Sequence, residues 1–177
     1  LEQVCYDIKD LGVKYLTVYA FSTENWKRSR EEVDGLMKLF RSYLKKCIKI
    51  SRDNKMKIKI IGDISAFAPD IQESIHKLEE FSKDYDELYF QIAMNYGSRD
   101  EITRGMKKMA QDVADGKLSP DEVTESRIES YLDTAGVPDP DLLIRTSGEQ
   151  RLSNFLMWQL AYAEFYFTDV AWPDFHK

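Results

Sequence analysis

The sequence predicts an α/β fold in which a parallel β-sheet is surrounded by helices. Segments rich in β-branched and aromatic residues alternate along the chain with amphipathic helical segments, which is typical of parallel sheets covered on both faces. Several expected strands also lead directly into polar loops, as strands do at the ligand-binding edge of such sheets. Because 177 residues suffice for one domain with a sizeable core, we expect residues 1–177 to form a single domain.

The first part of the chain contains two helix–strand units. Apolar residues recur at helical spacing over residues 1–11, and residues 15–21 are rich in the aromatic and β-branched residues of strands. Ser29 and Glu32 have the spacing of a capping box, which predicts the start of a long amphipathic helix. In residues 56–61 lysines alternate with apolar residues, so we expect a strand with one wet side near the edge of the sheet.

The second part of the chain continues this alternation. Pro69 suits the first turn of a helix, and residues 88–94 are the next expected strand. Ser98 and Glu101 have the spacing of a further capping box. Beyond them the sequence predicts short helices near 119–122 and 128–132, a buried strand at 142–144, a helix at 155–162 and a β-like segment within 164–170.

The composition is that of an ordinary globular protein, with 43% hydrophobic and 32% charged residues. The net charge of −6 argues against a general nucleic-acid binder. Cys5 and Cys47 lie on apolar helical stripes, which indicates core residues of a reduced, cytoplasmic protein rather than a disulfide. His76 and His176 are far apart in sequence, which argues against a structural zinc site. The sequence contains no apolar run of membrane-spanning length and no signal peptide.

The loop after residues 142–144 is the strongest candidate for a binding site. Residues 145–154 contain two arginines, three hydroxyl side chains and a glycine. Guanidinium groups match phosphate oxygens, and hydroxyls with free N–H groups at the start of the expected helix would complete an anion cradle. The plain alternative is a polar loop with capping residues and surface ion pairs. Arg28 and Arg99 follow two other expected strands, so a phosphate-bearing ligand at the shared strand edge is favoured.

Five motifs, in a fixed order, span nearly the whole chain: Phe21–Trp26 with Arg28, Asn95–Gly97, Arg145–Phe155, Ala163–Phe167 and Trp172–Phe175. In these motifs the chain resembles the cis-prenyltransferases of the undecaprenyl diphosphate synthase type. The resemblance implies a Mg²⁺-dependent homodimer that adds isopentenyl diphosphate repeatedly to an allylic diphosphate, usually farnesyl diphosphate. The implied product is a long-chain polyprenyl (undecaprenyl) diphosphate, the membrane lipid that carries cell-wall glycans. A cytoplasmic enzyme, peripheral at the membrane, would suit that product.

The resemblance also assigns roles in the loop after residues 142–144. Arg145, Arg151 and Ser153 match the positions that hold isopentenyl diphosphate, and Glu149 and Leu152 belong to the same substrate-binding motif. Two forked donors and a hydroxyl suit the several anionic oxygens of a diphosphate. The plain role of Glu149 is to orient one of the arginines through an ion pair.

Two further groups are assigned by the resemblance. Glu164 matches the magnesium ligand, although a carboxylate paired with an arginine is the plain alternative. The substrate-binding loop beside the allylic diphosphate and the reacting carbons corresponds to Ser22, Thr23, Glu24, Trp26 and Arg28, with Asn25 as its catalytic residue. An amide is a very poor base, so Asn25 would position the substrate while a diphosphate oxygen or a carboxylate takes the proton. Trp26 could instead be a hydrophobic lid.

An apolar face could line a tunnel for the growing product. Leu36, Phe40 and Leu44, together with Leu88 and Ile92, are the candidates, although such a face is more often plain core.

The family pattern also has parts that residues 1–177 lack. The family begins with a strand and an Asp-Gly-Asn-Gly-Arg-Trp segment that supplies the catalytic aspartate, and it ends in an arginine- and glycine-containing tail. We therefore expect a domain truncated at both ends, which by itself does not make polyprenyl diphosphate. One alternative is a non-catalytic partner subunit of a cis-prenyltransferase, but the diphosphate ligands such relatives tend to lose are present. A sugar-phosphate or nucleotide enzyme is disfavoured because the chain has no Gly-rich nucleotide loop.

Overall fold

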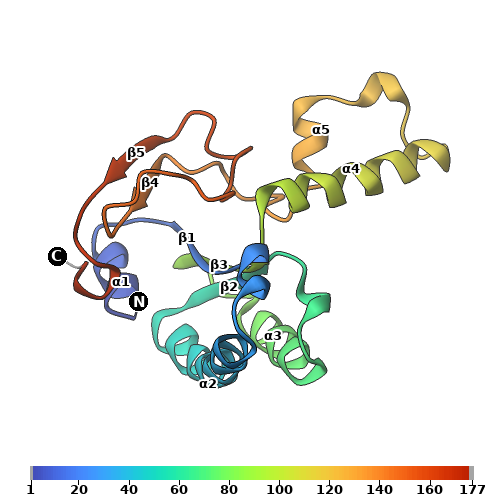
Figure 1. Ribbon diagram of the computed structural model, residues 1–177. Coiled ribbons are helices and arrows are strands. Elements are labelled where there is room, and N and C mark those ends of the chain that lie inside the picture. Colours follow the sequence, from blue (N-terminus) through green and yellow to red (C-terminus); the bar gives the residue numbers. More distant parts are fainter. Residues whose placement is uncertain (1, 176–177) are drawn as a thin grey trace.

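The computed structural model describes residues 2–175, so Leu1 and His176 lie outside the described residues. A three-stranded parallel sheet with the order β1-β3-β2 forms the centre, and a separate two-stranded parallel sheet contains β4 and β5 (Figure 1). In chain order the elements are α1 (Glu2–Asp10), β1 (Tyr15–Ser22), α2 (Arg30–Asn54), β2 (Met56–Ile61), α3 (Pro69–Ser82), β3 (Leu88–Tyr96), α4 (Ser98–Ala114), α5 (Glu125–Glu129), β4 (Leu142–Arg145) and β5 (Glu164–Phe167). The predicted parallel strands and helices are confirmed, but the strands are divided between two sheets.

The lysine-bearing strand lies at an edge of the central sheet, as its sequence predicts. β2 pairs only with β3, while β3 is flanked on both sides. Met56 and Ile58 of β2 are buried, whereas Lys59 is exposed. Almost every residue of β3 is buried, because strands on both sides and packed side chains on both faces cover it.

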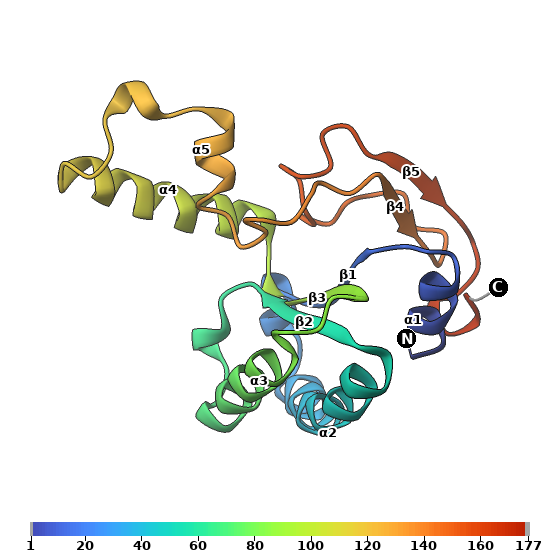
Figure 2. The same cartoon turned by 180° about the vertical axis from the view of Figure 1, so that it is seen from behind.

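Helices α2 and α3 cover one face of the central sheet (Figure 2). The capping box at the start of α2 is confirmed: the Glu32 N–H donates to Ser29 Oγ at 3.3 Å, and the Ser29 N–H donates to Glu32 Oε2 at 3.1 Å. Cys5 and Cys47 are both buried in this part of the core, as expected. Burial raises the pKa of the Cys47 thiol to about 12, so it stays protonated at neutral pH.

The side chains considered as a tunnel lining are packed in this core, with Leu36 partly buried against it. Leu88 and Ile92 of β3 are 0% and 3% exposed. Phe40 and Leu44 of α2 belong to the same hydrophobic cluster and are 7% and 2% exposed. In this structure they therefore form plain core, the simpler of the two sequence interpretations.

The opposite face of the central sheet is covered by turns rather than by the helix expected at 155–162. Phe155, Leu156 and Leu160 pack there against Ala93 and Tyr96 of β3. The helix prediction is wrong: residues 155–162 form bends and turns, and the backbone is left-handed at Leu156 (φ 43°), just after two further left-handed residues, Ser153 (φ 51°) and Asn154 (φ 63°). A right-handed helix cannot contain such residues. The helix N-terminus that was expected to complete an anion cradle after residues 145–154 is therefore missing.

The capping box predicted at the start of α4 is also wrong. Ser98 is the first helical residue rather than the cap, and its Oγ accepts a hydrogen bond from the Met157 N–H at 3.0 Å. Glu101 is buried and accepts from the Tyr96 hydroxyl and from the Asp133 N–H. Both side chains are thus used for tertiary contacts. Beyond its first turns α4 projects away from the sheets, with α5 folded back along it (Figure 1).

Within residues 2–175, the structure has no helix with both the length and the apolar character needed to cross a membrane.

Candidate functional site

Three turns that follow β1, β3 and β4 meet at one point, Gly97. A Cβ added to Gly97 would lie 2.8 Å from Thr23 Oγ1 and 2.6 Å from Asn154 Nδ2. Real Cβ atoms do not approach other atoms so closely, so a side chain at position 97 would have to displace Thr23 or Asn154. The expectation that polar loops gather at the carboxyl ends of parallel strands is therefore confirmed for these three loops.

The turn after β1 is a short 3-10 helix, Thr23–Lys27, that fixes the candidate catalytic residue. Asn25 Oδ1 accepts a hydrogen bond from the Ser22 N–H at 2.8 Å. Trp26 Nε1 donates to Asn95 Oδ1 at 2.7 Å, and its ring packs edge-on against Phe21 at 5.0 Å. The indole is therefore tied to the turn after β3 and is more than a loose hydrophobic lid. The side-chain oxygen of Asn25 is already used as an acceptor within its own turn.

The charged residues of this turn point outward and pair locally. Glu24 forms an ion pair with Lys27, and Arg28 lies 3.9 Å from Glu32. The side chain of Arg28 is 53% exposed, so the pair is weak and leaves the guanidinium free to meet a ligand.

The loop after β4, residues 145–153, folds around Arg145, and we call it the arginine loop. Arg145 Nη1 donates to the Arg151 carbonyl at 2.8 Å and to Ser153 Oγ at 3.1 Å. Arg151 forms an ion pair with Glu149, which is the plain role considered for this glutamate. Leu152 packs against the hydrophobic cluster that contains Phe155 and Tyr96. Of the residues that the resemblance assigns to isopentenyl diphosphate, Arg145 and Ser153 are thus in side-chain contact, and Arg145 meets Arg151 through its backbone carbonyl.

Tyr19 of β1 supports the arginine loop from below. Its hydroxyl donates to the Tyr96 carbonyl at 2.9 Å and makes a longer contact, 3.5 Å, with the Ser153 carbonyl. Its ring stacks on Phe155 with 4.6 Å between centroids. Burial raises the pKa of Tyr19 to about 12, so the hydroxyl remains a donor across the neutral range.

Asp169 lies beside the arginine loop and was not among the candidates from the sequence. The Gly148 N–H donates to the Thr168 carbonyl at 3.0 Å, which fastens the arginine loop to the segment after β5. The Asp169 carboxylate oxygen Oδ1 lies 3.1 Å from the position of a Cβ on Gly148, so it lies directly beside the loop. Asp169 follows β5 as the loop follows β4, but the sequence placed it within the β-like segment expected in residues 164–170, so its position after a strand end was not recognised.

Glu164 is not brought to the arginine loop within this chain. It is the first residue of β5 and pairs with Leu142, whereas Arg145 pairs with Phe167 at the other end of the two strands. Three residues of parallel strand separate the two positions by roughly 10 Å. Glu164 is exposed, and its N–H donates to the Asp141 carbonyl at 2.8 Å.

The carboxylates near the loop decide which metal the site could hold. Among residues 2–175, no group of three His, Cys, Asp or Glu side chains is arranged to bind a metal ion by itself. Magnesium bound to a diphosphate needs only one or two protein carboxylates, because phosphate oxygens and water complete its coordination. Asp169 fits that requirement by its position beside Gly148. Glu164 has suitable chemistry but does not lie at the same place.

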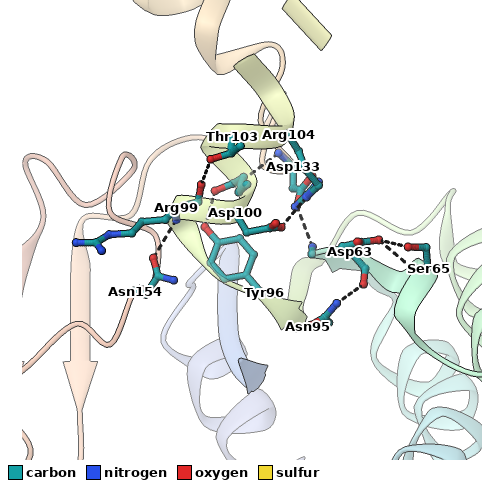
Figure 3. Close-up of polar contacts among 12 residues, drawn as sticks. Asp63, Ser65, Asn95, Tyr96, Arg99, Asp100, Thr103, Arg104, Asp133 and Asn154 are labelled. Carbon is teal, nitrogen blue, oxygen red and sulfur yellow. Dashed lines mark hydrogen bonds and ion pairs between the residues drawn. The ribbon is translucent and has the colours of Figure 1, made fainter. Parts of the chain in front are cut away.

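A polar network braces the strand edge next to the site (Figure 3). Arg104 donates to both carboxylate oxygens of Asp133 at 2.9 and 2.6 Å, and to Asp100 at 2.7 Å. Asp133 also accepts from the Gly62 N–H at 2.9 Å, which ties α4 and the segment after α5 to the end of β2. The guanidinium of Arg99 points away from this network (Figure 3). The network is therefore a support, and Arg99 is not one of its members.

Comparison with known proteins gives a consistent family. A family model described as "Putative undecaprenyl diphosphate synthase" matches residues 1–177. An isoprenyl transferase of Clostridium perfringens is 47% identical over 176 residues, which are 99% of this chain and 70% of that protein. An isoprenyl transferase of Agrobacterium fabrum is 48% identical over 168 residues, which are 95% of this chain and 68% of that protein.

Two solved structures share the fold. A lavandulyl diphosphate synthase from Lavandula x intermedia, in complex with dimethylallyl diphosphate, superposes with a TM-score of 0.95 at 37% identity, covering 99% of this chain and 76% of that one. A probable undecaprenyl diphosphate synthase from Campylobacter jejuni superposes with a TM-score of 0.87 at 34% identity, covering 98% of this chain and 79% of that one.

Proposed function

Because the chain belongs to the undecaprenyl diphosphate synthase family of isoprenyl transferases, we propose that it condenses isopentenyl diphosphate with an allylic diphosphate. Farnesyl diphosphate is the proposed allylic substrate, and the product is a long-chain polyprenyl diphosphate that serves cell-wall lipid carrier synthesis. The observation that carries this proposal is the arginine loop, in which Arg145 and Ser153 converge at 3.1 Å on the edge where parallel sheets bind ligands.

The arginine loop suits a diphosphate for reasons of charge and geometry. Arg145 contributes only Nη1 to the two hydrogen bonds described, so the guanidinium keeps further N–H groups for anionic oxygens. Ser153 Oγ accepts from Arg145, which leaves its own proton to donate to the ligand. Arg151 is 66% exposed and paired with Glu149, so it would meet the diphosphate at the rim. These are the groups proposed to hold isopentenyl diphosphate.

The turn after β1 is proposed to hold the allylic diphosphate. Thr23 Oγ1 and Asn154 Nδ2 both lie within 3 Å of the position of a Cβ on Gly97, so this turn is next to the segment that follows the arginine loop. Two diphosphates bound on either side of this point would bring their prenyl groups next to each other. The relative that was solved with dimethylallyl diphosphate supports an allylic ligand in this family.

In the proposed reaction, the double bond of isopentenyl diphosphate attacks the carbon that carries the allylic diphosphate. A carbon–carbon bond forms, diphosphate leaves, and one proton is lost from the isopentenyl unit. The Asn25 side-chain oxygen already accepts from Ser22, which agrees with a positioning role rather than that of a base. Mg²⁺ would neutralise the diphosphate charge, and Asp169 is the carboxylate best placed beside the loop to hold it.

We also propose a homodimer formed through the second sheet. One face of the β4–β5 sheet exposes large apolar side chains, with Leu142 52%, Ile144 42% and Tyr166 54% exposed. Contiguous exposed apolar residues of this kind are typical of interaction surfaces. The non-catalytic partner subunit is the less favoured alternative, because the diphosphate-binding residues are present and converge. The long-chain lipid product suits a cytoplasmic enzyme working next to a membrane.

A condensation assay with a magnesium titration tests this function. Residues 1–177 replace the matching region of the Clostridium perfringens isoprenyl transferase, and radiolabelled isopentenyl diphosphate is followed into butanol-extractable product. We expect incorporation that requires farnesyl diphosphate. In the same background Asp169→Asn should raise the Mg²⁺ concentration needed for half-maximal rate by about 10-fold or more, because it removes a charged oxygen ligand.

Glu164→Gln is the matched carboxylate variant. A rise in its magnesium requirement equal to that of Asp169→Asn would mean that Glu164 reaches the metal from a second chain, since it does not lie at the loop of its own chain. No incorporation by the folded hybrid would contradict the proposed function. A magnesium dependence unchanged in both variants would contradict the metal assignment.

A further inference from the structure

We propose that Asn154 is a positioning residue that locks the arginine loop onto the first turn of α4 and thereby sets the affinity of the loop for a diphosphate. This inference rests on the proposed function. Asn154 immediately follows Ser153, the hydroxyl residue that Arg145 contacts, and it lies at the point where the three turns meet. It makes no contact with the guanidinium groups themselves in the described hydrogen bonds, so it acts through its neighbours.

Asn154 caps α4 from a distant part of the sequence. The first N–H groups of a helix have no partner within the helix. Here the Ser98 N–H donates to the Asn154 carbonyl at 2.8 Å, and the Arg99 N–H donates to Asn154 Oδ1 at 2.9 Å (Figure 3). Asparagine is a favoured capping residue because its side chain is short and its amide oxygen accepts hydrogen bonds from backbone N–H groups. In most helices the cap is the preceding residue, so a cap from the arginine loop joins two elements that the chain does not connect directly.

The backbone at this position also favours asparagine. Asn154 has φ 63° and Ser153 has φ 51°, both in the left-handed region. Asparagine enters that region more readily than other residues with a side chain. Consecutive Cα atoms are only about 3.8 Å apart, so a shift of Asn154 shifts Ser153 and with it one of the two contacts of Arg145.

The residues after Asn154 are anchored independently. The Met157 N–H donates to Ser98 Oγ at 3.0 Å, and Gln159 Nε2 donates to Glu101 Oε2 at 3.2 Å. Phe155 is buried and stacks on Tyr19. A change confined to Asn154 therefore leaves the segment docked on β3 and α4, and its main effect is on the loop that precedes it. This separates a positioning role from a general loss of fold.

The test measures the binding of inorganic pyrophosphate to residues 1–177 by isothermal titration calorimetry. Asn154→Ala removes the side-chain cap and disfavours the left-handed backbone, so we expect about 3- to 10-fold weaker binding. Asn154→Gly removes the same cap but accepts a positive φ freely. It should also weaken binding, which shows that the cap and not the backbone strain is responsible.

Thr124→Ala is the control, because it also removes one helix cap. Thr124 Oγ1 accepts from the Arg127 N–H at 3.2 Å at the start of α5, away from the loop. We expect Thr124→Ala to lower the melting temperature about as much as Asn154→Ala does, and to leave pyrophosphate binding unchanged. Parental affinity in both Asn154 variants would overturn the positioning role while leaving the proposed function intact. No pyrophosphate binding by the parent chain would contradict the diphosphate site itself, and the positioning role with it.

Discussion

Arg145→Ala should weaken the binding of isopentenyl diphosphate by about 10- to 150-fold. This loss of affinity corresponds to the roughly 1.5–3 kcal/mol that one charge-assisted hydrogen bond contributes. Two effects act together in this variant. The ligand loses a forked donor, and the arginine loop loses the hydrogen bonds from Nη1 to the Arg151 carbonyl and to Ser153 Oγ. Calorimetric titration of isopentenyl diphosphate into the parent and the variant measures the loss directly.

Two other arginines provide the controls for this prediction. Arg151→Ala should cost less, because Arg151 is 66% exposed and shares its charge with Glu149. Arg52→Ala removes an exposed arginine of similar surroundings, 58% exposed and paired with Asp53 on α2, and should leave binding unchanged. If the Arg145 variant and the parent bound isopentenyl diphosphate with equal affinity, the assignment of the arginine loop as the diphosphate site would be wrong.

Leu88→Ala should lower the free energy of unfolding by about 2–5 kcal/mol. Leu88 begins the central strand β3 and is 0% exposed, so truncating it leaves a cavity in the largest hydrophobic cluster. Urea denaturation followed by circular dichroism gives the change in free energy. Leu39→Ala on α2 is the matched control, because the same substitution at a side chain that is 58% exposed should change stability by about 0.5 kcal/mol or less.

Leu88→Ala also distinguishes the two interpretations of Leu88, as a core residue or as part of a tunnel lining. A core residue changes stability and leaves the distribution of product lengths alone. If Leu88→Ala kept the stability of the parent but altered product length in the condensation assay, Leu88 would line a tunnel and the packed core in this structure would represent a closed state of it.

Local sequence patterns were sufficient for most of the elements. The capping box of Ser29 and Glu32 starts α2, Pro69 is at the first turn of α3, and alternating lysines identify the edge strand β2. Each of these depends on neighbours within a few residues. The predictions that were wrong concern residues whose partners are distant in the sequence. Ser98 and Glu101 have capping-box spacing, but the segment around Asn154 provides the cap, which frees both side chains for tertiary contacts.

The same distinction applies to the site. Arg145, Arg151 and Ser153 are close in sequence, so their convergence could be predicted from one loop. Asp169 depends on the pairing of β4 with β5, which a single sequence does not reveal. The register of that pairing also places Glu164 at the far end of the strands from the loop. Interactions that span two elements were therefore the ones that sequence patterns could not provide.

A crystal structure of the chain with isopentenyl diphosphate and Mg²⁺ tests the central claim most directly. We predict diphosphate oxygens within about 3 Å of the Arg145 guanidinium and of Ser153 Oγ, with Arg151 at the rim of the site and the Asp169 carboxylate on the metal side. A diphosphate bound elsewhere, with the arginine loop unchanged and without ligand contacts, would contradict the assignment of this loop as the substrate site.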